Sequence, residues 1–174
     1  MSDFYDKVKG EQDPVTKILA KIPGFSGYVE RFDRRMSDKL LREQVANDFE
    51  PLYQRISSLQ RQVISQGGLA YVDDLEAAAI KLRQFIDRVR TASYGYAGFF
   101  DAVKIKEDDM TQIYQFDLQL LNLKETVQHA IDNVEVSLGT DGLPAALQNL
   151  ITTAQSCLDT FNQRSEVLKG LATS

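Results

Sequence analysis

Apolar residues recur at steps of three and four over most of this chain, and that spacing constrains its fold more than any other feature. Between positions 41 and 63 the steps are 4, 4, 3, 4, 3 and 4, and a second run over 72–89 alternates three and four without error. An α-helix places such positions on one face, close to the 3.5-residue repeat of coiled-coil seams. Alternating β-branched runs and Asn-Gly hairpins, which indicate strands, do not occur. The sequence therefore predicts an all-α fold.

Glycines and prolines divide this pattern into long helices. Gly67 and Gly68 end the first run, Gly139 and Gly142 frame a turn, and Pro144 suits the first position of a last helix. We predict helices over about 25–66, 69–103, 109–138 and 143–170. Short joints favour antiparallel neighbours, so we expect an elongated, coiled-coil-like, antiparallel up-down-up-down four-helix bundle over 25–174. A short N-terminal helical arm, residues 1–24, precedes it.

Pro51 lies inside the first predicted helix. A proline within a helix removes one hydrogen bond and clashes with the preceding turn. The apolar phase nevertheless continues from Phe49 to Leu52 and beyond. We therefore expect one long helix, kinked near Pro51, rather than two separate helices.

Length, charge and cysteine content exclude several classes of protein. The 174 residues fit one domain, and the net charge of −5, from 20 basic and 25 acidic side chains, disfavours a general nucleic-acid binder. Cys157 is the single cysteine, so it cannot form an intramolecular disulfide. No apolar run approaches the roughly 20 residues that span a bilayer, and the N-terminus lacks the apolar core of a signal peptide. We expect a cytoplasmic protein.

No familiar catalytic or metal-binding pattern stands out. Bundles that hold paired metals use repeated Glu-x-x-His motifs, whereas His129 is the only histidine and its nearest upstream acid, Glu125, is four residues away. Cys157 adjoins a seam residue, where a small apolar side chain is common, and serine nucleophile elbows need a strand–turn–helix context. We expect no enzyme activity, no cofactor, no metal and no small-molecule ligand.

One stretch looks specialised, because glycines and aromatic residues alternate over 94–100. The helical phase of the second run places its glycines off the seam, which predicts helix packing at a close approach. A G-x-x-G clamp on nucleic acid is the alternative, but such clamps sit beside a sheet. The candidate packing or interaction residues here are Tyr94, Gly95, Gly98 and Phe99.

Arginines concentrate in two further places. Arg31, Arg34 and Arg35 alternate with acidic residues in the first predicted helix, and Arg88 and Arg90 lie on the second. Mixed charges at helical spacing usually form a solvated face with local ion pairs. Docking of an acidic partner is the alternative interpretation.

Two segments carry a resemblance to a known family. "GYVERFDRRMSDKLLR" and "FIDRVRTASYGYAGFFDAVKIKEDDMTQIYQFD" resemble a family of bacterial long-helix proteins, over most of residues 24–138. Members of that family occur alongside membrane-scaffold proteins of the stomatin/flotillin (band 7) type. The resemblance implies an association of that kind, and it brings no catalytic residues.

The sequence thus favours a non-enzymatic helical protein–protein interaction or scaffold module, with a protein partner or self-association. The alternative is a peripheral subunit of a membrane-associated complex at the inner face of the membrane, docking through the N-terminal arm. The arm's apolar face would be supplied by Phe4, Tyr5, Val8, Ile18, Leu19, Ile22 and Phe25, and within the arm a short amphipathic helix is expected from Val15, Ile18, Leu19 and Ile22. Its four lysines are balanced by four acidic residues, so anionic lipid would gain little.

Overall fold

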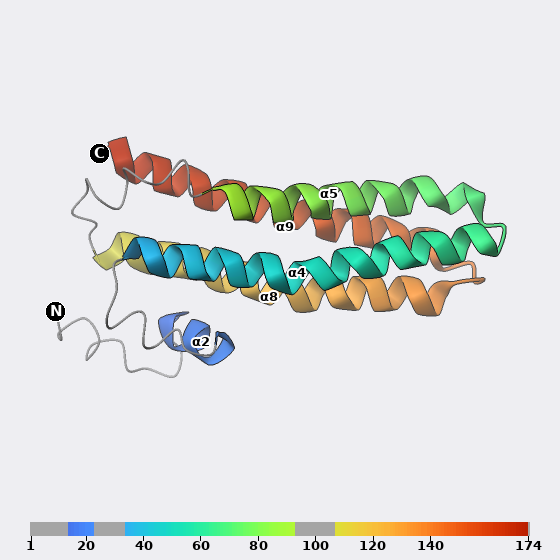
Figure 1. Ribbon diagram of the computed structural model, residues 1–174, viewed down its shortest axis with the longest axis horizontal. Helices are drawn as coiled ribbons and strands as arrows, with labels where there is room; N and C mark the ends of the chain where they lie inside the picture. The colour runs from blue at the N-terminus through green and yellow to red at the C-terminus, as the bar shows by residue number, and fades with distance from the viewer. Residues whose placement is uncertain (1–13, 23–33, 93–106, 174) are drawn as a thin grey trace.

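The computed structural model describes residues 14–22, 34–92 and 107–173 of the chain. The helices within them are α2 (Pro14–Lys21), α4 (Arg34–Ser65), the 3₁₀ turn η1 (Leu69–Tyr71), α5 (Val72–Thr91), α8 (Glu107–Ser137) and α9 (Leu143–Thr173). These three ranges contain no strand. The four long helices form an elongated bundle with α2 on its outside (Figure 1). The predicted all-α helical bundle is confirmed.

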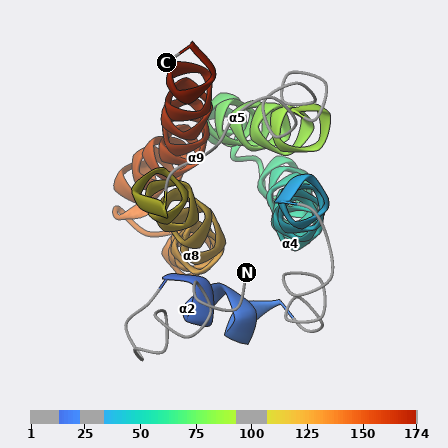
Figure 2. The ribbon, with the colours of Figure 1, turned by 90° about the vertical axis from the view of Figure 1, so that its left-hand side faces the viewer.

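The long helices alternate in direction along the chain, as predicted (Figure 1). Around the bundle their order is α4, α5, α9 and α8, so that α5 packs on α9 and α4 packs on α8 (Figure 2). Both of these pairs are parallel. Short joints make α4 and α5, and likewise α8 and α9, antiparallel neighbours. The longer connection between α5 and α8 allows those two helices to lie apart.

Three side-chain hydrogen bonds fix the register of the parallel α5–α9 pair. They join Asp74 to Gln148, Lys81 to Gln155 and Arg88 to Asn162, each across 74 positions of the chain. A constant offset occurs only between parallel helices. Successive bonds are seven residues apart, because two turns of an α-helix return nearly the same face to its neighbour.

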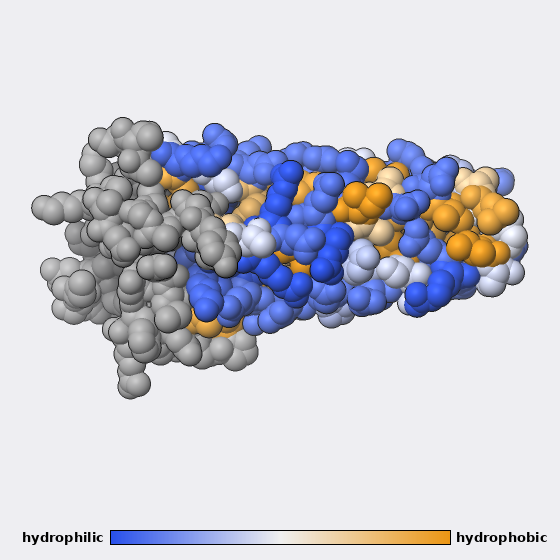
Figure 3. Space-filling view, turned by 45° about the horizontal axis from the view of Figure 1, so that its top comes forward, coloured by the Kyte–Doolittle hydropathy of each residue, from blue (hydrophilic) through white to orange (hydrophobic). Residues whose placement is uncertain are grey.

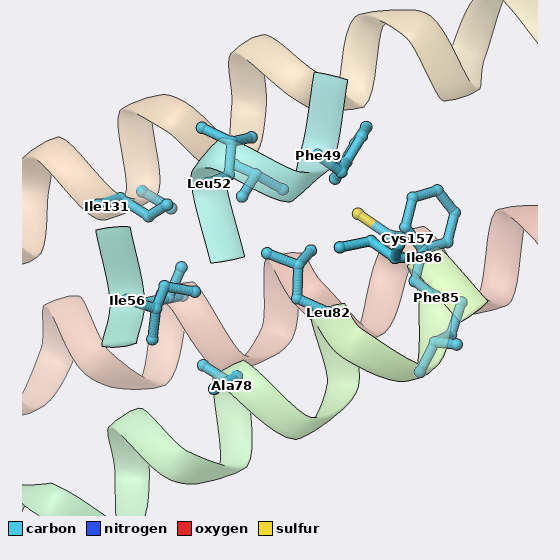
Figure 4. Close-up of a cluster of buried hydrophobic side chains, with 14 of the residues drawn as sticks. Phe49, Leu52, Ile56, Ala78, Leu82, Phe85, Ile86, Ile131 and Cys157 are labelled. Atoms are coloured by element: carbon cyan, nitrogen blue, oxygen red, sulfur yellow. The ribbon is translucent and has the colours of Figure 1, made fainter. Parts of the chain in front are cut away.

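The predicted seams form the core. On α4 every seam residue from Leu41 to Val63 is buried. On α5 every seam residue from Leu75 to Val89 is buried as well. Phe85 is fully buried between the rings of Phe49 and Phe161, whose centroids lie 4.8 and 6.3 Å from its own. Edge-to-face arrangements of this kind are the favoured geometry of aromatic pairs. Figure 4 shows Phe49, Phe85 and Ile86 among the aliphatic residues of this cluster.

Pro51 stays inside α4, as the continuous phase predicted. Its side chain is exposed, so the missing hydrogen bond falls on the solvent side of the helix, where its loss costs least.

Several helix ends differ from the prediction. The first joint takes one 3₁₀ turn, so α5 begins at Val72 rather than near 69, while α8 begins at Glu107 rather than near 109. Gly67 and Gly139 have φ of 78° and 74°, a left-handed conformation that ends a helix and that glycine adopts without strain. The predicted helical residues 25–33 and 93–103 lie outside the described ranges.

Candidate functional site

Four charged side chains are buried together inside the bundle. Asp38 and Arg42 come from α4, Asp117 from α8 and Arg164 from α9, and none of them is more than 7% exposed. Charged residues are rarely buried this completely unless they are paired. This buried ion network is the most unusual chemical feature among the described residues.

Each long helix contributes to the network. Arg42 Nε donates to Asp38 Oδ2 at 2.8 Å, and Arg42 Nη1 donates to the Val89 carbonyl of α5 at 3.1 Å. Arg164 bridges two carboxylates, with Nε donating to Asp117 Oδ1 and Nη2 to Asp38 Oδ1, both at 2.5 Å. Arg164 Nη1 is buried and has no hydrogen-bond partner within the described ranges.

The network is electrically balanced near neutral pH. Burial raises the pKa of Asp117 to about 6, although the charge of Arg164 and its hydrogen bond act in the opposite direction. For Arg164, burial alone lowers the pKa, but the charges of Asp117 and Asp38 outweigh it and raise the pKa above its ordinary value. Two arginines and two aspartates then cancel. The network's hydrogen bonds between helices, from Arg42 to Val89 and from Arg164 to Asp117 and Asp38, tie α4, α5, α8 and α9 together.

Sequence reasoning missed this network, although the spacing held a signal. Steps of three and four along α9 allow either Arg164 or Ser165 after Phe161; Arg164 is buried, whereas Ser165 is half-buried. On α8 the same steps allow either Phe116 or Asp117 after Ile113; Asp117 is buried, whereas Phe116 is half-buried. Charged residues that keep a seam's steps are therefore candidates for buried pairing.

The residues considered for catalysis or metal binding are not assembled into a site. His129 is exposed, and Glu125 pairs with Lys21 of α2 at 3.4 Å. The Cys157 side chain lies within the apolar cluster (Figure 4), and burial raises the pKa of its thiol to about 12. Over residues 14–22, 34–92 and 107–173, no group of three or more His, Cys, Asp or Glu side chains could hold a metal ion.

The predicted interaction residues fall into three groups. Tyr94, Gly95, Gly98, Phe99 and Arg31 lie outside the described residues, and for Arg34 and Arg35 only the helical backbone of α4 is described. Arg88 is exposed and donates to Asn162 at 3.0 Å, and Arg90 is exposed and pairs with Glu50 at 3.0 Å. These last two arginines therefore already have partners within the bundle.

An amphipathic helix is bound on the outside of the bundle. Val15, Ile18 and Leu19 of α2 and Ile22 directly after it lie at positions i, i+3, i+4 and i+7. Ile18 is 0% exposed and joins the core cluster, and α2 packs against α8. This spacing is the usual pattern of a helix bound in an apolar groove.

Helix α2 packs against α8, where Lys21 pairs with Glu125. Glu125, the residue that pairs with Lys21, is separated from Leu121, Leu118 and Tyr114 by four, seven and eleven positions, which places all of them on one face of the helix. Leu121 is buried, and the other two apolar residues pack against the core cluster. We call these four residues of α8 the outer α8 face.

Further along, the same side of the bundle carries an open depression of about 440 Å³ between α4 and α8. It is lined by Pro51, Gln54, Arg55, Ser58, Leu59, Gln62 and Glu135. Arg55 crosses from α4 to α8, with Nη2 lying 2.7 Å from an oxygen of Asp132 and 2.9 Å from one of Glu135. The rim is polar, and Pro51 supplies exposed apolar surface.

Large apolar side chains are also exposed near the end of the bundle that carries the two short joints. Leu69 is 69% exposed and Val136 is 76% exposed, and Ile64 is exposed as well. Figure 3 shows hydrophobic residues gathered on the visible face at this end. Among the described helices, none has the length and apolar character needed to cross a membrane.

Comparison of the chain with protein-family models, with curated proteins and with solved structures finds no match. The resemblance to long-helix proteins that accompany band 7 scaffolds therefore stays a prediction.

Proposed function

We propose that this chain is a non-enzymatic helical interaction module that binds a protein through the α4–α8 side of its bundle. The observation that carries this proposal is the binding of α2 to the outer α8 face. There the bundle holds an amphipathic helix that lies outside its four-helix core. A surface that accepts one helix has the apolar groove and charged rim that helix recognition requires.

Two other sides of the bundle are already joined by polar contacts. The α5–α9 side is joined by three hydrogen bonds in register, and the α4–α5 side by the pairing of Glu50 with Arg83 and Arg90. The α4–α8 side has both the bound α2 and the open depression. Apolar surface beside a polar rim is typical of interaction sites.

A membrane role would use the same part of the arm differently. The apolar residues Val15, Ile18 and Ile22 are buried in the bundle, so α2 would have to leave α8 before those side chains could enter lipid. The observed packing therefore favours a protein partner over a lipid surface.

Site-specific photo-cross-linking tests the proposed function. A photoreactive residue replaces Ser58, which is exposed in the depression, and a matched variant carries it at Gln84, which is exposed on α5. In native lysate we expect discrete cross-linked products from position 58 that position 84 does not give. Equal labelling at both positions, or none at 58, would contradict binding through the α4–α8 side.

A further inference from the structure

We propose that the outer α8 face is a binding site for α2 of a second copy of this chain, so that two copies associate by exchanging their α2 helices. This inference rests on the proposed interaction function and names the partner. It requires α2 to leave its own bundle and to dock in the same way on its neighbour.

The matching of α2 and α8 is the first argument. Lys21 pairs with Glu125, and the core cluster includes or packs against both Ile18, Leu19 and Ile22 and, from α8, Tyr114, Leu118 and Leu121. In the described part of α2, Lys17 and Lys21 are the only charged side chains. A basic amphipathic helix is thus the chemistry this face recognises, and every copy of the chain carries one.

The weakness of α2 as an isolated element is the second argument. It has 8 residues, fewer than an isolated helix needs to persist in water, so its helical state depends on the face that holds it. Its ion pair with α8, Lys21 with Glu125, has side chains that are 34% and 69% exposed. Such an exposed pair contributes little.

Exchange conserves the contacts that hold α2. Two separate copies contain two α2–α8 contacts, and a reciprocal pair of copies contains the same two, so the balance depends on protein concentration and on the connection between α2 and α4. That connection, residues 23–33, has a maximum reach of about 40 Å when fully extended. Because α2 and the outer α8 face belong to one chain, each experiences the other at an effective concentration in the millimolar range. A docked α2 therefore implies a dissociation constant below about 1 mM for the same contact between separate molecules.

Complementation between two full-length variants tests the proposal. Ile18→Asp removes the central apolar residue of α2 and leaves the outer α8 face intact, while Leu121→Asp damages that face and leaves α2 intact. Sedimentation should show each variant alone as a monomer and an equimolar mixture at several hundred micromolar as a 1:1 complex. Introducing Ile18→Asp into the Leu121→Asp chain should abolish the complex.

A peptide titration keeps the test decisive if Leu121→Asp impairs folding. A fluorescent peptide of residues 14–22 should bind the Ile18→Asp protein saturably below about 1 mM. It should bind the parent at least about twofold more weakly, because the parent's own α2 competes. The same peptide with Ile18→Asp is the matched control and should bind neither protein.

Two results would overturn the inference. One is failure of the peptide to bind the Ile18→Asp protein at 1 mM when circular dichroism shows that its bundle is folded. The other is a mixture that stays monomeric with both variants folded. Cross-linking at position 58 to a different protein would still support the proposed function, so the two failures can be told apart.

Discussion

Replacing Arg164 with methionine tests the role of the buried ion network directly. Methionine keeps an unbranched apolar stem, so the change removes mainly the guanidinium group. Arg164 is 1% exposed and donates to Asp117 and Asp38. In its absence Asp38 keeps its bond from Arg42, whereas residues 14–22, 34–92 and 107–173 supply no other hydrogen bond to the Asp117 carboxylate.

The expected loss of stability follows from that unpaired charge. Removing one partner of a buried ion pair typically costs about 3–5 kcal/mol, because the remaining charge stays desolvated. We expect Arg164→Met to lower the free energy of unfolding by that amount at pH 7. Far-UV circular dichroism during urea denaturation measures it, because the chain contains no tryptophan.

The pH dependence of this loss has a definite sign. Burial raises the pKa of Asp117 from 3.8 to about 6, so the folded protein binds this proton more tightly than the unfolded chain does. The resulting stabilisation is complete below about pH 4 and is lost as the pH rises through 6. Arg164 opposes the rise, so Arg164→Met should raise the pKa of Asp117 further. At about 1.4 kcal/mol per unit, the deficit at pH 5 should be smaller than at pH 7 by about 1–2 kcal/mol.

Asp117→Asn provides the matched background for this experiment. With no carboxylate at position 117, Arg164→Met should cost less than in the parent, with a coupling energy of about 1–3 kcal/mol. The pH dependence of the deficit should also shrink. The reasoning would be refuted by an Arg164→Met protein within 1 kcal/mol of the parent at pH 7, or by a deficit that is the same at pH 5.

Three further outcomes follow from the packing. Cys157, whose thiol pKa burial raises to about 12, should resist alkylation in the native protein and react at the unfolding midpoint; rapid native labelling, read by mass spectrometry, would contradict this. Gly68→Ala should destabilise the protein by about 1–3 kcal/mol, because the added Cβ would lie 2.9 Å from a Val63 methyl group. Gly170→Ala should stabilise it by up to about 1 kcal/mol, because the Cβ there meets nothing within 4 Å. Thermal unfolding of the two variants measures both changes. Phe85→Ala should cost about 3–5 kcal/mol in urea denaturation, and a loss below 1 kcal/mol would count against the aromatic cluster.

Local spacing alone predicted the helices and most of the core. The steps from Leu41 to Val63 place seven residues on one face of a helix whatever the rest of the chain does, and all seven are buried. The amphipathic pattern of α2 was equally readable. These features depend only on the 3.6-residue turn, which acts over short distances in the sequence.

Tertiary structure decided which helices are neighbours and which charges are buried. The apolar residues of α5, spaced three and four apart, could pack against any partner helix. Only the three-dimensional arrangement places α5 parallel to α9. Asp117 and Arg164 would normally be read as solvent-exposed residues, because an isolated helix cannot bury a charge without cost. Their burial needs opposite charges from other helices, and positions as distant in sequence as 38 and 164 meet only when the bundle has formed. The same reason explains why the place where α2 docks could not be read from the sequence.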